Sequence, residues 1–242
     1  MFLFIRLVLG HFIADFPLQF NKVYELKHKG LKGGIPHALL VTGSLLIVSW
    51  PYLYLPRMWG FIFFVAVVHL FQDSIKISYG KLRYTFWLYI LDQIIHIATI
   101  AVIFLTDLKY LEPPHTDASF ILNLYNNDSF FIYLSALIVG TYNGHYLMRT
   151  FRATFFANPG KHDEFEKWYG MLERAGIVTM FLLRGFYFFL IPLILILRVI
   201  IFSLGKERLK LDSQFISPSE MALSWIIAGL TGAGLYLILS LL

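Results

Sequence analysis

The chain has 242 residues, of which 58% are hydrophobic and only 14% are charged, and its mean hydropathy is +0.67. Soluble domains are about half apolar and about a quarter charged, so this composition indicates an integral membrane protein. The absence of cysteine excludes disulfides and thiolate metal ligands. Unbroken apolar runs cross a bilayer as helices, and the predicted fold class is therefore an all-α polytopic membrane protein.

Apolar segments long enough to cross a membrane recur along the chain, and we predict about eight spans. The sixth and seventh are separated by a break at Arg184-Gly185, with one long kinked helix or a re-entrant pair as the alternative. The polar, glycine-rich stretch Asn21–Gly34 predicts a short interfacial helix followed by a flexible loop. The predicted spans are Phe2–Phe20, Pro36–Leu55, Gly60–Ile77, Tyr84–Leu105, Ser129–Thr150, Glu164–Leu183, Gly185–Leu204 and Ser219–Leu241.

The net charge of +5 arises from basic residues in particular loops, so we expect no nucleic-acid partner. Loops after the odd-numbered spans hold fourteen Lys and Arg, and loops after the even-numbered spans hold three. Because Lys and Arg are in excess on the cytoplasmic side, both termini are predicted to lie outside. The predicted organisation is a four-helix membrane core over residues 1–106, an external loop over 107–128, and a C-terminal helical membrane region over 129–242.

Three of the predicted spans carry a histidine and an aspartate four residues apart. Residues at this spacing lie on one face of a helix, and ionisable groups inside a membrane span are costly enough to indicate a function. The predicted topology puts all three pairs at a similar depth in the cytoplasmic half of the bundle. The residues of these pairs are His11, Asp15, His69, Asp73, Asp92 and His96.

Neutral imidazole nitrogens and ionised carboxylate oxygens are combined as ligands in open zinc and non-haem iron sites. We therefore predict that the six residues bind a divalent metal, with zinc favoured and manganese, iron or magnesium as alternatives. A cation would also keep three neighbouring carboxylates ionised. The alternative is a purely structural network of interhelical hydrogen bonds.

Further polar residues lie on the cytoplasmic side of the pairs and are candidates for supporting the ligands or for binding an anionic substrate. For the lysines, the alternative is a charge that only sets the topology. His37 would cover the site from the cytoplasmic edge of the second span. These candidates are Gln19, Lys22, His37, Lys76 and Gln93.

Glu173 and Arg174 lie inside the sixth predicted span. We interpret them as a structural ion pair between this helix and its neighbours, with Arg198 as a candidate partner. The alternative joins them to the polar centre. Catalytic residues are not assigned.

The stretch His11-Phe12-Ile13-Ala14-Asp15-Phe16-Pro17-Leu18-Gln19, followed by Lys22, resembles the opening HxxxDFxxQ signature of domain-of-unknown-function family 3307. His37, the His69-xxx-Asp73-xx-Lys76 motif and the Asp92-Gln93-xx-His96 motif follow in the family's order. Gly170–Arg174 is similar to a GxLER motif of longer members. The resemblance implies a multi-pass protein of the bacterial cytoplasmic membrane, in which the His/Asp pattern is a family feature. It implies no established activity.

Together these features favour a cytoplasm-facing metalloprotein in the membrane, acting as a hydrolase on a lipid-linked or phosphate-bearing substrate such as an anionic lipid. Transport of protons or a divalent ion is one alternative. A membrane scaffold or signalling subunit, with a cytoplasmic protein partner or a homo-oligomeric state, is the other. Outside the His/Asp pairs, the outer halves of the first, third and fourth spans hold only Arg6 and Thr99 as strongly polar residues. This pattern favours a one-sided pocket over a path through the membrane.

Overall fold

The computed structural model describes residues 1–79, 85–115, 119–155, 164–209 and 217–242. These residues contain helices and connecting segments and no strand, which confirms the all-α prediction for them. The chain forms two compact units, Met1–Ser135 and Ala136–Leu242. Each unit is described by itself below.

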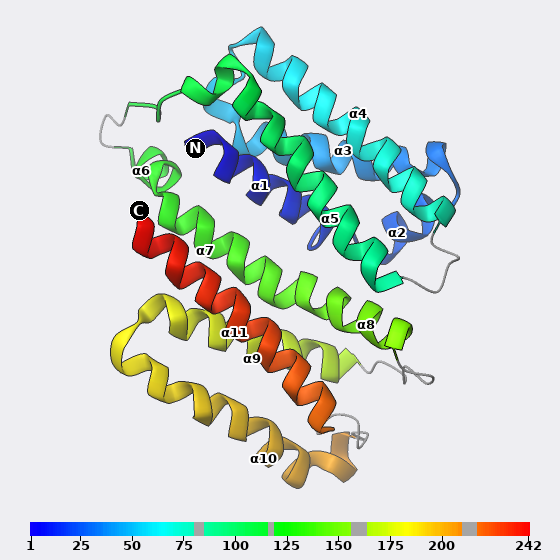
Figure 1. The fold of residues 1–242 in the computed structure, drawn as a ribbon, viewed down its shortest axis with the longest axis vertical. Helices are drawn as coiled ribbons and strands as arrows, with labels where there is room; N and C mark the ends of the chain where they lie inside the picture. Colours follow the sequence, from blue (N-terminus) through cyan, green and yellow to red (C-terminus); the bar gives the residue numbers. More distant parts are fainter. Residues whose placement is uncertain (80–84, 116–118, 156–163, 210–216) are drawn as a thin grey trace. The chain divides into compact units, whose positions relative to one another are not determined.

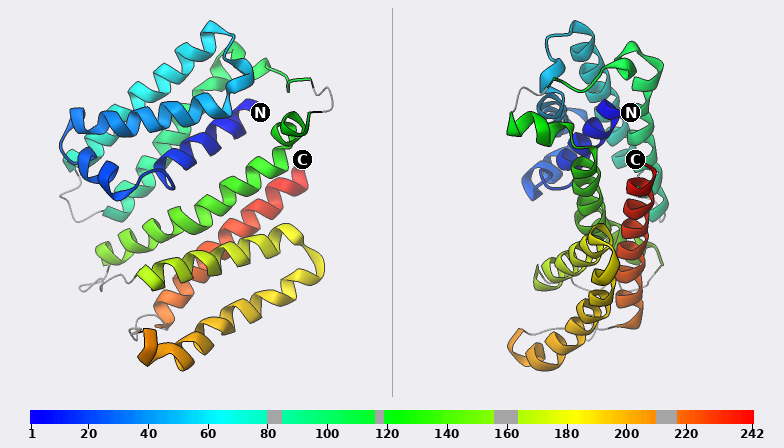
Figure 2. Two further views of the ribbon diagram at one scale, coloured as in Figure 1. Left: turned by 180° about the vertical axis from the view of Figure 1, so that it is seen from behind. Right: turned by 90° about the vertical axis from the view of Figure 1, so that its left-hand side faces the viewer.

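The first unit is built around four helices, α1 (Phe2–Asp15), α3 (Leu31–Val48), α4 (Pro56–Tyr79) and α5 (Thr85–Ala101). Figures 1 and 2 show them side by side, and α1 and α4 each contact both α3 and α5. The four helices therefore enclose a common interior. Shorter elements complete the unit: α2 (Asn21–Lys27), η1 (Trp50–Tyr52), η2 (Val102–Leu105), η3 (Asp107–Tyr110), α6 (Phe120–Asn126) and the first part of α7 (Asp128–Ile138).

The segment that follows η2 packs against the ends of α1 and α3 within this unit. Arg6 is fully buried; its guanidinium donates to the Tyr125 carbonyl and pairs with Asp128. The Tyr125 hydroxyl donates to the carbonyl of Val48 over 2.8 Å. The Tyr52 hydroxyl similarly reaches the Glu112 carbonyl over 2.6 Å. These contacts close one end of the four-helix interior.

The structure has a tight corner between α2 and α3 where the sequence predicted a flexible loop. The residues Leu31–Gly34, predicted to be flexible, form the first turn of α3. Gly30 turns the chain with a φ of 92°, a conformation that favours glycine. A Cβ on Gly33 would stand 2.0 Å from the Leu26 carbonyl oxygen, so the two backbones pack together directly. The glycines that suggested flexibility are therefore what allow this tight corner.

Replacing Gly33 by Ala is expected to lower the free energy of unfolding by about 1–3 kcal/mol, because the added methyl must push α2 away from α3. Gly43→Ala is the matched control on the same helix, since its Cβ would meet nothing within 4 Å. That change should be neutral or stabilise by up to about 1 kcal/mol. Thermal unfolding in detergent measures both, and equal stability of the two variants would contradict the described corner.

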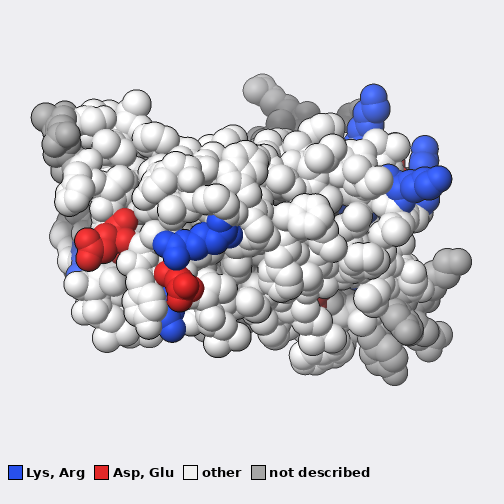
Figure 3. All heavy atoms as spheres, turned by 90° about the horizontal axis from the view of Figure 1, so that it is seen from above, with Lys and Arg blue, Asp and Glu red and all other residues white. Residues whose placement is uncertain are grey.

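Five described helical segments are long and apolar enough to cross a membrane, which supports the membrane-protein class. They are Leu31–Val48, Pro56–Ser78, Thr85–Leu105, Gly185–Gly205 and Pro218–Leu241. Most of the face shown in Figure 3 carries no charged side chain, and the visible charges gather toward its two ends. On α4, large apolar side chains such as Phe63, Phe71 and Ile75 are exposed. A lipid environment would cover such side chains.

The predicted number of eight spans is not confirmed and stays a prediction. The first predicted span corresponds to α1, which has 14 residues. The fifth is divided into α7, the π-helix η4 (Val139–Asn143) and α8 (Gly144–Phe155). The sixth is α9 (Glu164–Leu183), which carries several charged residues. The predicted start of the fourth span, Tyr84, lies outside the described residues.

In the second unit, α9 packs against α10 (Ile191–Leu209) and α11 (Pro218–Leu241). The predicted break between the sixth and seventh spans is confirmed. Helix α9 ends at Leu183, Arg184 and Gly185 adopt φ values of 60° and 56°, and the 3₁₀ helix η5 (Gly185–Leu190) leads into α10. A positive φ at two successive residues cannot continue a right-handed helix, which is why the chain turns here.

Candidate metal centre

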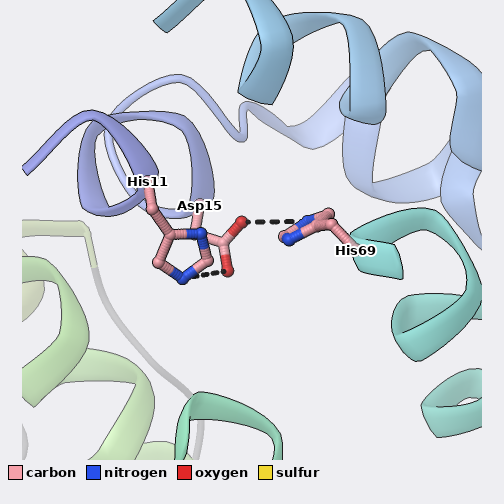
Figure 4. A group of neighbouring side chains, drawn as sticks. All are labelled: His11, Asp15 and His69. Atoms are coloured by element: carbon pink, nitrogen blue, oxygen red, sulfur yellow. Dashed lines mark ion pairs between the residues drawn. The ribbon is translucent and has the colours of Figure 1, made fainter. Parts of the chain in front are cut away.

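The interior of the four-helix bundle holds all six predicted ligands. Each of them is at least nine-tenths buried, and each His/Asp pair comes from a single helix turn of α1, α4 or α5. Figure 4 shows the Asp15 carboxylate between the rings of His11 and His69. The Asp15 oxygens lie 3.7 Å from His11 Nε2 and 3.4 Å from His69 Nε2. The i,i+4 spacing thus places the pairs as the sequence predicts, and the bundle brings the three pairs together.

His37 on α3 belongs to the centre itself and not to its edge. Its side chain is fully buried, and its Nε2 lies 3.1 Å from Asp15 Oδ1 and 3.1 Å from His69 Nε2. The predicted position at the edge was wrong because α3 begins at Leu31 and not at Pro36, so His37 lies more than one turn inside the helix. The bundle therefore contributes a polar side chain to the centre from each of its four helices.

Three ligand atoms, from His37, His69 and Asp73, lie at the spacing expected around one ion, and Asp15 Oδ1 adjoins the two histidines. His37 Nε2 and His69 Nε2 lie 3.5 Å and 3.2 Å from Asp73 Oδ2. Together with the contacts of His37 and His69 to Asp15 Oδ1, five distances among these atoms fall between 3.1 and 3.5 Å. Ligands about 2.0–2.1 Å from a shared tetrahedral metal are about 3.3 Å apart. The arrangement could hold a divalent metal.

Two further groups of ligand type adjoin this set. His11, Asp15 and His69 form one, and Asp73, Asp92 and His96 form the other, with ligand atoms within 4.8 Å of one another in each. Asp73 connects the groups, because Oδ2 faces His37 and His69 while Oδ1 lies 3.9 Å from His96 Nε2. Within the described residues, His11 Nε2 and Asp73 Oδ1 are buried without a hydrogen-bond partner. Such atoms are costly unless a cation or water satisfies them, so the donor set fits a metal.

Two lysines compensate the charge of the three aspartates. Lys76 Nζ donates to Asp92 Oδ2 over 2.5 Å, and Gln93 Nε2 donates to the same oxygen over 3.2 Å. Lys27 Nζ lies 2.6 Å from Asp73 Oδ2. With neutral histidines the centre therefore carries a net charge of −1. The sequence argument assigned to a metal the role of keeping the carboxylates ionised, and these two ammonium groups contribute to the same stabilisation.

Lys27 is the residue of the centre that sequence reasoning missed. It is one of four lysines in Asn21–Gly34, and the family-like signature points to Lys22 instead, whereas Lys22, Lys29 and Lys32 are all exposed. The candidates Lys76 and Gln93 contact Asp92. Gln19 and Lys22 do not join the centre: Gln19 is half-buried after α1, Lys22 is exposed on α2, and neither side chain bonds to another described residue.

The second unit holds a separate buried polar network, in which Glu173 forms an ion pair with Arg198, the partner that the sequence offered on a neighbouring helix. Glu173 accepts from Arg198 Nη1 at 3.0 Å, from Ser224 Oγ at 3.0 Å and from Trp225 Nε1 at 3.2 Å. Arg174 instead donates to the carbonyls of Gly140 and Thr141, to the Ser224 hydroxyl and to Met148 Sδ. Adjacent helical residues point in different directions and do not face each other, so Arg198 is the ion-pair partner.

Arg174 donates hydrogen bonds to two backbone carbonyls within its own unit. Gly140 and Thr141 belong to the π-helix η4, where the hydrogen-bonding register changes and carbonyls become available. The guanidinium binds both carbonyls, at 2.6 Å and 3.2 Å. The Glu173 and Arg174 network is thus saturated by groups of its own unit, as expected for a structural role.

The apolar helices and the buried His/Asp centre define an all-helical membrane protein whose interior could hold a divalent metal. Residues 3–119 match the family model described as "Protein of unknown function (DUF3307)", and this part of the chain, which contains the entire centre, belongs to that family. The GxLER-like stretch Gly170–Arg174 lies outside the matched residues. No curated protein and no solved structure matches the chain.

Proposed function

We propose that the protein is a metalloenzyme of the bacterial cytoplasmic membrane, with eight spans, both termini outside and the His/Asp centre open to the cytoplasm. One divalent cation, with zinc favoured, would be held by Asp15, His37, His69 and Asp73. The observation that carries the proposal is that His37 Nε2, His69 Nε2 and Asp73 Oδ2 lie 3.1–3.5 Å from one another inside a buried bundle, with Asp15 Oδ1 3.1 Å and 3.4 Å from the two histidine nitrogens. That spacing suits a single ion.

The proposed reaction is hydrolysis of a lipid-linked or phosphate-bearing substrate. A bound divalent ion supplies Lewis acidity and an activated water near neutral pH. His11, whose buried Nε2 has no hydrogen-bond partner among the described residues, would accept a proton. Lys76 is only partly buried and would attract an anionic group while holding Asp92 in place.

The rest of the bundle favours a one-sided pocket over a transport path. One turn beyond His11 lies Leu7, which is fully buried, as are Leu45, Met58 and Ile62 from the neighbouring helices. Arg6 and its partners close the same end. A polar substrate entering from the side of Lys76 would meet an apolar barrier behind the centre, which supports an enzyme rather than a channel or carrier.

Metal content tests the proposal. Protein purified in mild detergent without added metal or chelator is expected to contain about one equivalent of a transition metal by plasma mass spectrometry. The His69→Ala/Asp73→Ala variant should lose it. The matched control His115→Ala/Asp107→Ala removes the same residue types from exposed positions and should keep it. Absence of metal from the wild-type protein, even after reconstitution with zinc or manganese, would sink the proposal.

A further inference from the structure

Lys27 forms an ion pair with Asp73 Oδ2, an oxygen that the proposed metal would also bind. Its Nζ lies 2.6 Å from Asp73 Oδ2, the oxygen that also faces His37 Nε2 and His69 Nε2. The lysine side chain is 8% exposed, and it comes from α2, which is not one of the four helices of the bundle. A cationic side chain from a separate element thus reaches into the ligand set.

A metal bound to Asp73 would lie close to the Lys27 ammonium, which has the same sign of charge. A metal bound to Asp73 Oδ2 would stand about 2.0–2.2 Å from that oxygen, and therefore within about 5 Å of Lys27 Nζ. Charges of the same sign at this separation repel strongly in a buried site, where solvent screens them poorly. The ammonium and the metal therefore oppose each other at one carboxylate oxygen.

The net charge of the centre also favours withdrawal of Lys27 when a metal binds. The three aspartates and the two lysines leave the centre at −1 with neutral histidines. Adding a dication brings it to +1, whereas adding the dication and withdrawing Lys27 brings it to zero. A neutral buried centre is the least costly of these states in a membrane.

We infer that Lys27 is a built-in counter-ion that competes with the metal for Asp73, and that metal binding expels it and loosens α2. The inference rests on the proposed function, because it requires the His/Asp centre to bind a cation. It adds an affinity-setting residue and a coupling between the centre and α2.

Helix α2 is suited to such a release. It has seven residues, too few to be stable without tertiary contacts, and its buried side chains are Val23 and Lys27. Withdrawal of Lys27 removes one of these two attachments, while the direct packing of Gly33 on Leu26 still tethers the helix to α3. The expected consequence is local opening of α2 rather than unfolding of the bundle.

Zinc affinity tests the competition. Apo protein is titrated with Zn²⁺ against a chromophoric chelator for the wild type, Lys27→Gln and Lys29→Gln. The control Lys29→Gln removes the same charge from an exposed position two residues away. We expect Lys27→Gln to bind Zn²⁺ at least about tenfold more tightly, since a charge-assisted hydrogen bond no longer has to be broken, and Lys29→Gln to match the wild type.

Hydrogen exchange of residues 21–27 gives a second readout. In the wild type and Lys29→Gln, Zn²⁺ should accelerate exchange in α2; in Lys27→Gln, α2 should exchange at one rate with or without Zn²⁺. Unchanged or weaker Zn²⁺ binding by Lys27→Gln, or an equal gain in both variants, would overturn the inference while leaving the metal centre intact. No Zn²⁺ binding by any of the three proteins would overturn the proposed function and the inference with it.

Discussion

Replacing Asp73 by asparagine is expected to abolish metal binding and to lower the free energy of unfolding by about 3–5 kcal/mol. Asp73 faces His37, His69 and His96 and pairs with the buried Lys27. The amide cannot neutralise the ammonium, so the variant leaves an uncompensated charge in the bundle. Metal content and thermal unfolding in detergent measure the two effects.

The double variant Asp73→Asn/Lys27→Met separates the two causes. Removing both members of a buried ion pair is far less costly than removing one, so at least half of the lost stability should return. Metal binding should not return, because a ligand oxygen is still missing. An Asp73→Asn variant as stable as the wild type would show that Lys27 and Asp73 are not paired in the buried interior.

Replacing Glu173 by alanine is expected to destabilise the protein by about 3 kcal/mol or more without changing its metal content. The change leaves the Arg198 guanidinium, the Ser224 hydroxyl and the Trp225 indole without their shared acceptor. Arg198 is 5% exposed, so water cannot easily replace the carboxylate. Thermal unfolding in detergent, followed by metal analysis of the folded fraction, measures the outcome.

Glu173→Gln is the graded control for that substitution. The amide keeps the size of the side chain and one oxygen that accepts from Ser224 or Trp225, and it loses the charge opposite Arg198 and one acceptor oxygen. Its effect on stability should therefore be smaller than that of alanine. Loss of metal from either variant would contradict the separation of a structural network in the second unit from the His/Asp centre in the first.

The centre could be predicted from the sequence to the extent that it depends on single helices. The His/Asp pairs on α1, α4 and α5 could be predicted from the helical repeat and from the cost of ionisable groups in apolar segments. His37 was placed too far out because its depth depends on where α3 begins, and Gly33 and Leu26 decide that through a backbone contact. Lys27 could not be singled out, since three other lysines, one before it and two after it, lie in Asn21–Gly34.

The sequence by itself determined the class of protein, the three pairs that face one interior and the break at Arg184-Gly185, because hydropathy, helical period and backbone preference act over a few residues. Only the tertiary structure decided which lysine enters the centre, that His37 lies inside the centre, and that Glu173 and Arg174 have different partners. Those outcomes depend on distances between helices, which are set by packing of segments far apart in the chain and leave no periodic trace in it.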